Sequence, residues 1–112
     1  MSIFMKATLK VRTPHLVEFL DVLENNLVPM MEDLGWRLHG TFVQRFGSMQ
    51  PTVVVDLWEM EDMAHVERVL KDTGYRTDQR YLTAAPVLEA AVIEEQLEFM
   101  QRKFGRMKSF FP

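Results

Sequence analysis

The sequence predicts an α+β fold whose strands and helices follow one another in the order β-α-β-β-α-β, with an extra helical piece before the last strand. Apolar and polar residues alternate over 3–12 and 36–58, as in strands with two different faces. Apolar residues recur every three or four positions over 16–34 and 63–70, as in amphipathic helices. This order is the split βαβ pattern of a ferredoxin-like sandwich, and 112 residues suffice for one such domain with a substantial core.

The first strand and the first helix meet at Thr13 and Pro14. Thr13 suits the N-cap of a helix and Pro14 its first position. The apolar stripe of this helix continues to Leu34, and Pro29 is expected to kink its last turn or to end its regular part. Gly35 follows directly, where a helix commonly has a C-terminal glycine.

Residues 36–43 and 52–58 are predicted to form a hairpin, with a reversal over 46–51 where Gly47 and Pro51 interrupt the alternation. One face of the hairpin is expected to pack against helices and the other to remain open. The first face is assigned Trp36, Leu38, Phe42, Val53, Val55 and Leu57. The open face is assigned Arg37, His39, Thr41, Arg45, Val54, Asp56 and Trp58.

The remainder of the chain predicts a helix opening at Glu61 and ending at 72–74, a helical segment over 75–94 broken at Pro86, and a short final strand over 96–102. Residues 1–102 are expected to form one domain. The basic and aromatic tail 103–112 could lie across a partner subunit, cover a cavity as a lid, or be disordered.

Composition narrows the class of protein. The 13 basic and 16 acidic residues give a net charge of −3 with no clustered basic face, which argues against a nucleic-acid partner. The absence of cysteine removes thiolate chemistry and disulfides. No signal-peptide pattern is present and no apolar run reaches the roughly 20 residues of a membrane span, so a soluble, cytoplasmic protein without a membrane partner is expected.

The predicted open face carries considerable apolar surface, to which Val43, Val54, Trp58 and Met100 would contribute. A large exposed apolar patch usually marks an interface. A symmetric dimer with its two sheets face to face would cover that patch and enclose a cavity.

Several segments resemble a NIPSNAP-type domain of the dimeric α/β-barrel superfamily, over about residues 4–100. They are Phe19-Leu20, Pro29, the spacing from Leu34-Gly35 to Gly40, the Phe46-Gly47 turn and the run from Val55 to Asp62. The resemblance implies a homodimer that forms a dimeric α/β barrel. It also implies a superfamily whose enzymes often convert aromatic or polyketide-like molecules of secondary metabolism without a metal or organic cofactor.

The enclosed face would present groups suited to proton abstraction from an acidic carbon. His39 is the candidate base, because its unperturbed pKa of about 6.5 lies near working pH, and Asp56 on the neighbouring strand could orient the ring. Candidate substrate-binding residues share this predicted face: Lys6, Arg37, Thr41, Trp58 and Met100. Lys6 or Arg37 could stabilise a developing enolate and Trp58 could stack on a flat substrate. The alternative is a simple polar sheet face with Asp56 paired to Lys6 or Arg37.

The other polar groups carry weaker signals. His15 and His65 are interpreted as surface residues, and the three histidines lack the spacing of a metal site, so no metal is expected. Tyr75 and Tyr81 could edge a pocket mouth or cap the helix–sheet core. Two functions remain open: a cofactor-free monooxygenase, isomerase or cyclase acting on a small hydrophobic or aromatic molecule, and a non-catalytic dimeric ligand-binding or accessory protein.

Overall fold

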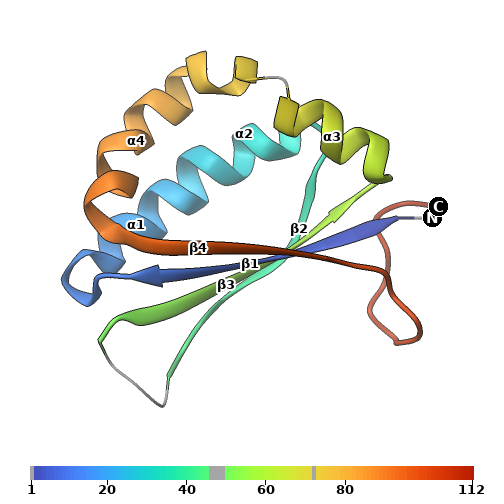
Figure 1. The fold of residues 1–112 in the computed structure, drawn as a ribbon, viewed down its shortest axis with the longest axis horizontal. Coiled ribbons are helices and arrows are strands. Elements are labelled where there is room, and N and C mark those ends of the chain that lie inside the picture. The colour runs from blue at the N-terminus through green and yellow to red at the C-terminus, as the bar shows by residue number, and fades with distance from the viewer. Residues whose placement is uncertain (1, 46–49, 72) are drawn as a thin grey trace.

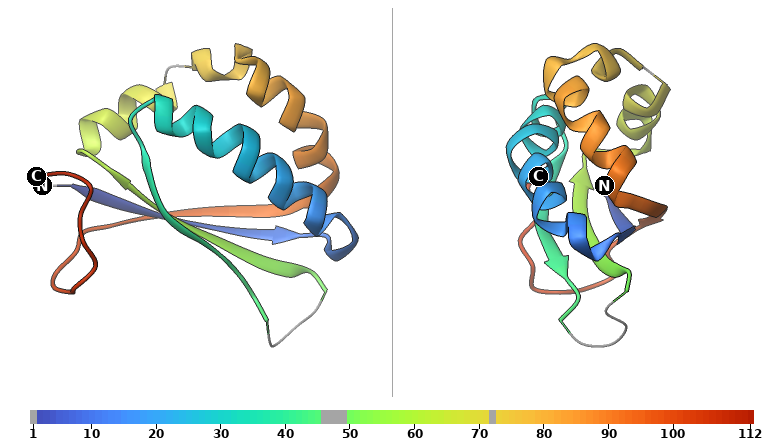
Figure 2. Two further views of the ribbon diagram at one scale, coloured as in Figure 1. Left: turned by 180° about the vertical axis from the view of Figure 1, so that it is seen from behind. Right: turned by 90° about the vertical axis from the view of Figure 1, so that its left-hand side faces the viewer.

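The computed structural model describes residues 2–45, 50–71 and 73–112, and it shows a four-stranded antiparallel sheet with helices over one face (Figure 1). The strand order is β2-β3-β1-β4. Two further views show the other face of the sheet without a helical layer (Figure 2). The strands are β1 (Ile3–Val11), β2 (Arg37–Val43), β3 (Thr52–Met60) and β4 (Val92–Met100). The predicted α+β, ferredoxin-like arrangement is confirmed.

The central strand β1 sets the register of the sheet. It pairs with β3, with Ala7 opposite Asp56, and with β4, with Ala7 opposite Leu97. β4 begins at Val92, so the prediction that the last strand starts at residue 96 was wrong. The alternation of side chains extends back through Glu94, which pairs with Lys10 on β1 at 3.1 Å.

The first helical region is one continuous rod of changing pitch. A 3₁₀ turn (Thr13–His15) leads into α1 (Leu16–Val22), a π turn (Leu23–Leu27) and α2 (Val28–Asp33). The π turn ends two residues before Pro29, which has no N–H to donate to the helical ladder. Gly35 follows with φ of +98°, as predicted for a C-terminal glycine.

The second helical region comprises α3 (Met63–Lys71), a 3₁₀ segment (Thr73–Thr77) and α4 (Gln79–Ala91). Asp78 caps α4 by accepting the backbone N–H of Arg80 at 2.8 Å. The predicted break at Pro86 is wrong, since Pro86 lies inside α4. Pro86 has no N–H, so the carbonyl of Leu82, four residues earlier, lacks its helical hydrogen bond. Both residues are exposed, and water can satisfy that carbonyl.

A β-bulge at His39 changes the face of the residues that follow it. Leu38 lies opposite Trp58 and Gly40 opposite Leu57, so His39 is the extra residue. Beyond the bulge, Thr41 lies opposite Asp56, on the helix side. The assignment of Thr41 to the open face was therefore wrong, and so was the assignment of Phe42 to the helix side. Predicted reversal residues 46–49 lie outside the described part of the chain.

The two faces of β3 are the reverse of those predicted. Val54, Asp56 and Trp58 are opposite Leu9, Ala7 and Met5, whose side chains lie under the helices. The open face receives the alternate residues Val53, Val55 and Leu57. Alternation could not identify the buried face because β3 is apolar on both sides, and the one carboxylate in its middle is only 4% exposed.

The core lies between the helix-covered face of the sheet and the helices. Phe19 of α1 and Val66 of α3 are 1% exposed, and Val11 and Val54 are fully buried. None of the helices in the described ranges combines the length and the apolar character required to cross a membrane.

Candidate functional site

The sheet separates residues that were predicted to share one site. His39, Lys6 and Met100 lie on the open face, whereas Asp56 and Trp58 lie between the sheet and the helices. The proposed pairing of His39 with Asp56 is therefore wrong, because the backbone of the sheet stands between them.

His39 belongs to a closed network with the C-terminal segment. Its Nε2 lies 2.8 Å from Oε1 of Glu59, and its ring lies 4.5 Å from that of Phe110 and 5.4 Å from that of Phe4. Glu59 is fully buried and also accepts hydrogen bonds from Ser2 at 2.6 Å, from the hydroxyl of Ser109 and from the amide of Phe110 at 2.9 Å. The end of the chain thus packs on the open face of its own sheet.

Burial alone would raise the pKa of Glu59. The hydrogen bonds from Ser109, Ser2, the Phe110 amide and His39 outweigh burial and lower the pKa of Glu59 to about 2. Glu59 is therefore a carboxylate at neutral pH. The His39 side chain, only 7% exposed, is occupied by this carboxylate and two aromatic rings.

The remaining predicted ligand-binding residues are dispersed. Arg37 donates to the carbonyls of Glu32 at 2.8 Å and Trp36 at 2.9 Å, at the end of α2. Lys6 lies between Leu57 and Glu98 on the open face, and Met100 lies at the far end of β4 beside Phe4. Lys6, Arg37 and Met100 do not line the cavity that contains Asp56.

That cavity lies between the sheet and the helices and has a volume of about 320 Å³. The small side chain of Ala7 forms part of its floor between Asp56 on β3 and Leu97 on β4. Its walls are mainly aliphatic, with methionines and leucines from the first helical region. Five aromatic residues complete the lining: Phe19, Trp36, Trp58, Tyr75 and Tyr81. Such an apolar hollow with a few polar groups is typical of a small-molecule site.

Asp56 is the buried ionisable group of this cavity. Its Oδ1 accepts the hydroxyl of Thr41 at 2.8 Å, and its side chain also accepts a hydrogen bond from Trp58. Burial raises the pKa of Asp56, the two hydrogen bonds lower it, and the negative charge of Glu95 raises it; the net effect is a pKa above the ordinary value of 3.8. A buried carboxyl with a raised pKa in an apolar hollow is a recurring feature of proton-transfer sites.

Trp36 also lines the cavity, and its indole N–H is a buried polar group. Trp36 is 3% exposed, and its indole N–H has no hydrogen-bond partner among the described residues. The ring lies edge-on to Trp58, with centroids 6.0 Å apart. A buried donor without an acceptor costs free energy, and an acceptor on a bound ligand would recover it.

Sequence reasoning missed Trp36 and Glu95 as site residues. Trp36 was predicted correctly on the helix side but interpreted as core. Glu95 fell between the predicted helical segment over 75–94 and the predicted strand over 96–102, although it stands two residues before Leu97 and therefore shares its face in a strand. Extending the alternation back from Leu97 would have found it. Tyr75 and Tyr81, in edge-to-face contact at 5.6 Å, line the cavity, which corresponds to the first of the two positions considered for them, the pocket and the helix–sheet core.

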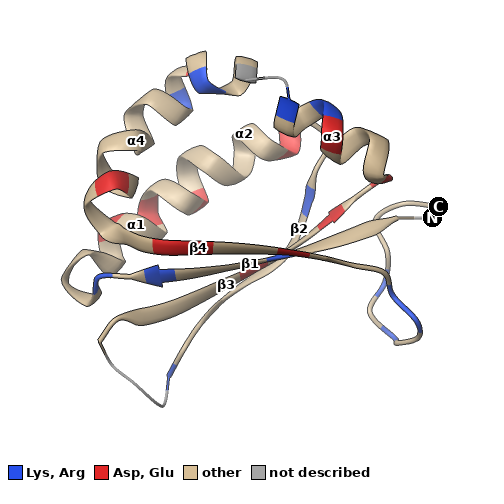
Figure 3. Cartoon of the chain, in the orientation of Figure 1, with Lys and Arg blue, Asp and Glu red and all other residues tan. Residues whose placement is uncertain are grey.

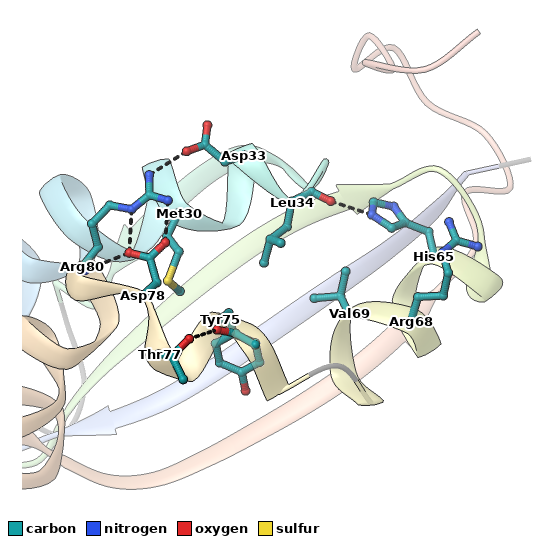
Figure 4. A pocket seen from close by; sticks show the side chains of 11 residues that line it. Met30, Asp33, Leu34, His65, Arg68, Val69, Tyr75, Thr77, Asp78 and Arg80 are labelled. Carbon is teal, nitrogen blue, oxygen red and sulfur yellow. Dashed lines mark hydrogen bonds and ion pairs between the residues drawn. The ribbon is translucent and has the colours of Figure 1, made fainter.

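A second, outer hollow of about 620 Å³ adjoins the cavity and shares Met30, Val69 and Tyr75 with it. Figure 4 shows several of its polar groups already engaged, among them His65 with the carbonyl of Leu34. Arg80 bridges Asp33 at 2.6 Å and Asp78 at 2.7 Å. We interpret the outer hollow as an approach to the cavity.

The other histidines take up local positions. His15 lies 3.9 Å from Glu18 of the same helical region, and His65 contacts the carbonyl of Leu34 at 2.7 Å. His65 is half-buried, so its prediction as a surface residue was only partly correct. Across residues 2–45, 50–71 and 73–112, no three His, Asp or Glu side chains converge in a way that could hold a metal ion.

The chain was compared with known proteins. The comparison with curated sequences gave no match. A NIPSNAP family protein from Agrobacterium tumefaciens superimposes with a TM-score of 0.76 at 16% identity, covering 96% of this chain and 100% of that one. A NIPSNAP-like domain protein from Burkholderia xenovorans gives 0.73 at 18% identity, covering 95% and 90%.

The fold is shared more widely. SnoaB, a cofactor-independent oxygenase from Streptomyces nogalater, superimposes with a TM-score of 0.62 at 13% identity, covering 93% of this chain and 95% of that one. At this identity the likeness concerns the fold alone. The sequence model of the NIPSNAP family matches residues 6–112, and the chain therefore belongs to the NIPSNAP family.

Proposed function

We propose that this protein is a cofactor-independent enzyme that removes a proton from an acidic carbon of an aromatic or polyketide-like molecule bound between the sheet and the helices. The observation that carries the proposal is Asp56, a carboxyl 4% exposed in the wall of an apolar, aromatic cavity. Isomerisation, cyclisation and oxygenation are the possible outcomes for the carbanion formed.

Asp56 takes the role of base that the sequence assigned to His39. A carboxylate with a raised pKa is a stronger base than an exposed aspartate, and its pKa lies closer to working pH. Thr41 and Trp58 hold the carboxylate in place from neighbouring positions on β2 and β3. His39 is engaged with Glu59 on the other side of the sheet and cannot reach a ligand in the cavity.

The substrate supplies the electrons and the enzyme accepts the proton. The carbon–hydrogen bond next to a carbonyl breaks, the proton moves to Asp56, and the electron pair moves onto the carbonyl oxygen as an enolate. The unpartnered indole N–H of Trp36 could stabilise that oxygen. The aromatic rings of the wall favour a flat substrate.

We also propose that the protein is a homodimer whose open sheet faces pack together as a dimeric α/β barrel. Phe42, 60% exposed, and Met100, 41% exposed, lie on that face. A face without a helical layer that carries such residues favours an interface. The likeness of its fold to that of proteins such as SnoaB supports both proposals.

The test uses 2-tetralone, a neutral bicyclic ketone with acidic hydrogens between its ring and its carbonyl. Incubation in D₂O and NMR detection measure exchange of these hydrogens for deuterium without knowledge of the natural product. The wild-type protein is expected to accelerate exchange over buffer, and Asp56→Asn to reduce that acceleration by about 100-fold or more. Glu61→Gln, at an exposed position after β3, serves as the control.

The results separate the two functions. Exchange that is accelerated equally by wild type and Asp56→Asn would remove Asp56 as the base. Binding of 2-tetralone without acceleration in wild type would favour the alternative, a non-catalytic ligand-binding or accessory protein.

A further inference from the structure

We infer that the cavity selects a substrate bearing a protonated amine, with the ammonium group at Glu95 and the reacting carbon at Asp56. The inference rests on the proposed function, because it specifies the class of substrate for the same cavity. Glu95 on β4 would be a second recognition point beside Asp56 on β3.

The charges that line the cavity are all of one sign. Asp56 and Glu95 are its only ionisable acids and no lysine, arginine or histidine stands in its wall, as far as the described residues go. Figure 3 shows that β4 carries acidic and no basic residues. Lys6 and Lys10 of β1 both face the open side, where Lys10 pairs with Glu94. An anionic ligand would therefore meet repulsion, and a cationic one attraction.

Glu95 is available to a ligand. Its neighbour Glu94 has a partner in Lys10, whereas Glu95 has no hydrogen bond or ion pair within the parts of the chain that the structure describes. It faces the side on which Leu97 and Asp56 line the cavity. An unpaired carboxylate beside an apolar hollow is suited to an ammonium group that enters with a hydrophobic body.

The cavity walls strengthen this preference. Trp36, Trp58, Tyr75 and Tyr81 present aromatic rings, whose negative faces attract cations. A second, independent feature points to a bound molecule, namely the Trp36 indole N–H that lacks an acceptor in a residue 3% exposed. A carbonyl or hydroxyl oxygen on the same ligand would satisfy it.

The spacing of the two carboxyl groups fits one molecule. Asp56 lies opposite Ala7 and Glu95 opposite Leu9, so the two groups flank β1 on the same face. Two strand spacings and an offset of two residues along β1 together separate their backbones by roughly 12 Å. The side chains shorten that span, and a bicyclic molecule with one amine can bridge it.

The experiment compares three probes that share one bicyclic body: 2-aminotetralin, 2-tetralol and tetralin-2-carboxylate. Dissociation constants come from quenching of tryptophan fluorescence, since both tryptophans of the chain line the cavity. The amine is expected to bind about threefold to tenfold more tightly than the alcohol, and the carboxylate more weakly than either. Glu95→Gln should lower the ratio of amine to alcohol affinity by about threefold or more, whereas Glu94→Gln, on the open face, should leave the ratio at its wild-type value.

Two results would overturn the inference. They are a carboxylate that binds as tightly as the amine, and an amine preference that is undiminished in Glu95→Gln. Failure of the proposed function looks different, because 2-tetralone would then undergo no accelerated deuterium exchange with wild type, whatever the ratio of amine to alcohol affinity. Alcohol binding that depends on Trp36 but shows no amine preference would contradict the amine class alone.

Discussion

Replacing Glu59 by glutamine should destabilise the protein and change how its stability depends on pH. Glu59 is fully buried, and Ser2, His39, Ser109 and Phe110 bond to it. Glutamine has nearly the same shape but no charge, and one end of its amide would place a donor against these donors. The network that holds the C-terminal segment to the open face would lose its centre.

The pKa values set the size and the sign of the effect. The pKa of Glu59 falls from an ordinary 4.5 to about 2 in the folded protein. This difference corresponds to roughly 3 kcal/mol of folding free energy. Because the folded pKa is the lower one, the stabilisation is fully present above the unfolded value of 4.5 and is lost as the pH falls towards 2.

Urea unfolding followed by tryptophan fluorescence at pH 7 and pH 3 measures both quantities. At pH 7, Glu59→Gln should be about 2–3 kcal/mol less stable than wild type. In a thermal melt, this loss corresponds to a fall in Tm of roughly 10 °C. Between pH 7 and pH 3, wild type should lose more stability than the variant. Glu61→Gln, exposed two residues later, should match wild type at both values. Parallel pH dependence in wild type and Glu59→Gln would refute the reasoning.

Three further outcomes are expected. Asp56→Asn should be more stable than wild type at pH 7, because a raised folded pKa gives stability that is present below 3.8 and is lost as the pH rises through the folded value; a thermal melt in which the variant is the less stable would contradict this. The pair Val55→Glu and Leu57→Glu, on the open face, should convert a dimer into a folded monomer by light scattering, whereas Val17→Glu, 80% exposed on α1, should leave the mass unchanged; a dimeric double variant would remove that face as the interface. Deletion of residues 103–112 should lower Tm and should add little to the effect of Glu59→Gln, since both remove the same hydrogen bonds; fully additive losses would show that the tail does not act through Glu59.

The sequence predicted the order of elements because strong local signals mark each one. The alternation of β1, the apolar stripe of the first helix and Gly35 with its positive φ all agree with the fold. Pro86 misled the prediction, since local propensity suggests a break where an exposed helix position tolerates the residue.

The site was harder to predict because it depends on which face of each strand is buried. The bulge at His39 shifts the alternation of side chains between the two faces of β2 by one residue. The bulge exists only where β2 pairs with β3, and the sequence of β2 alone does not reveal it. In β3, valines lie on both faces, and the usual rule places a lone aspartate towards solvent. Asp56 breaks that rule, and such breaks are concentrated at functional sites.

The most direct measurement uses the chain's two tryptophans, whose indole N–H groups give two separate signals in a ¹⁵N-correlated NMR spectrum. Trp36→Phe assigns them. On titration with 2-tetralone, the Trp36 signal, which has no acceptor among the described residues, should shift downfield as it gains one, while the Trp58 signal, already bonded to Asp56, should shift less. Indole signals that stay fixed while the amides of Phe42 and Val55 on the open face move would contradict a site between the sheet and the helices.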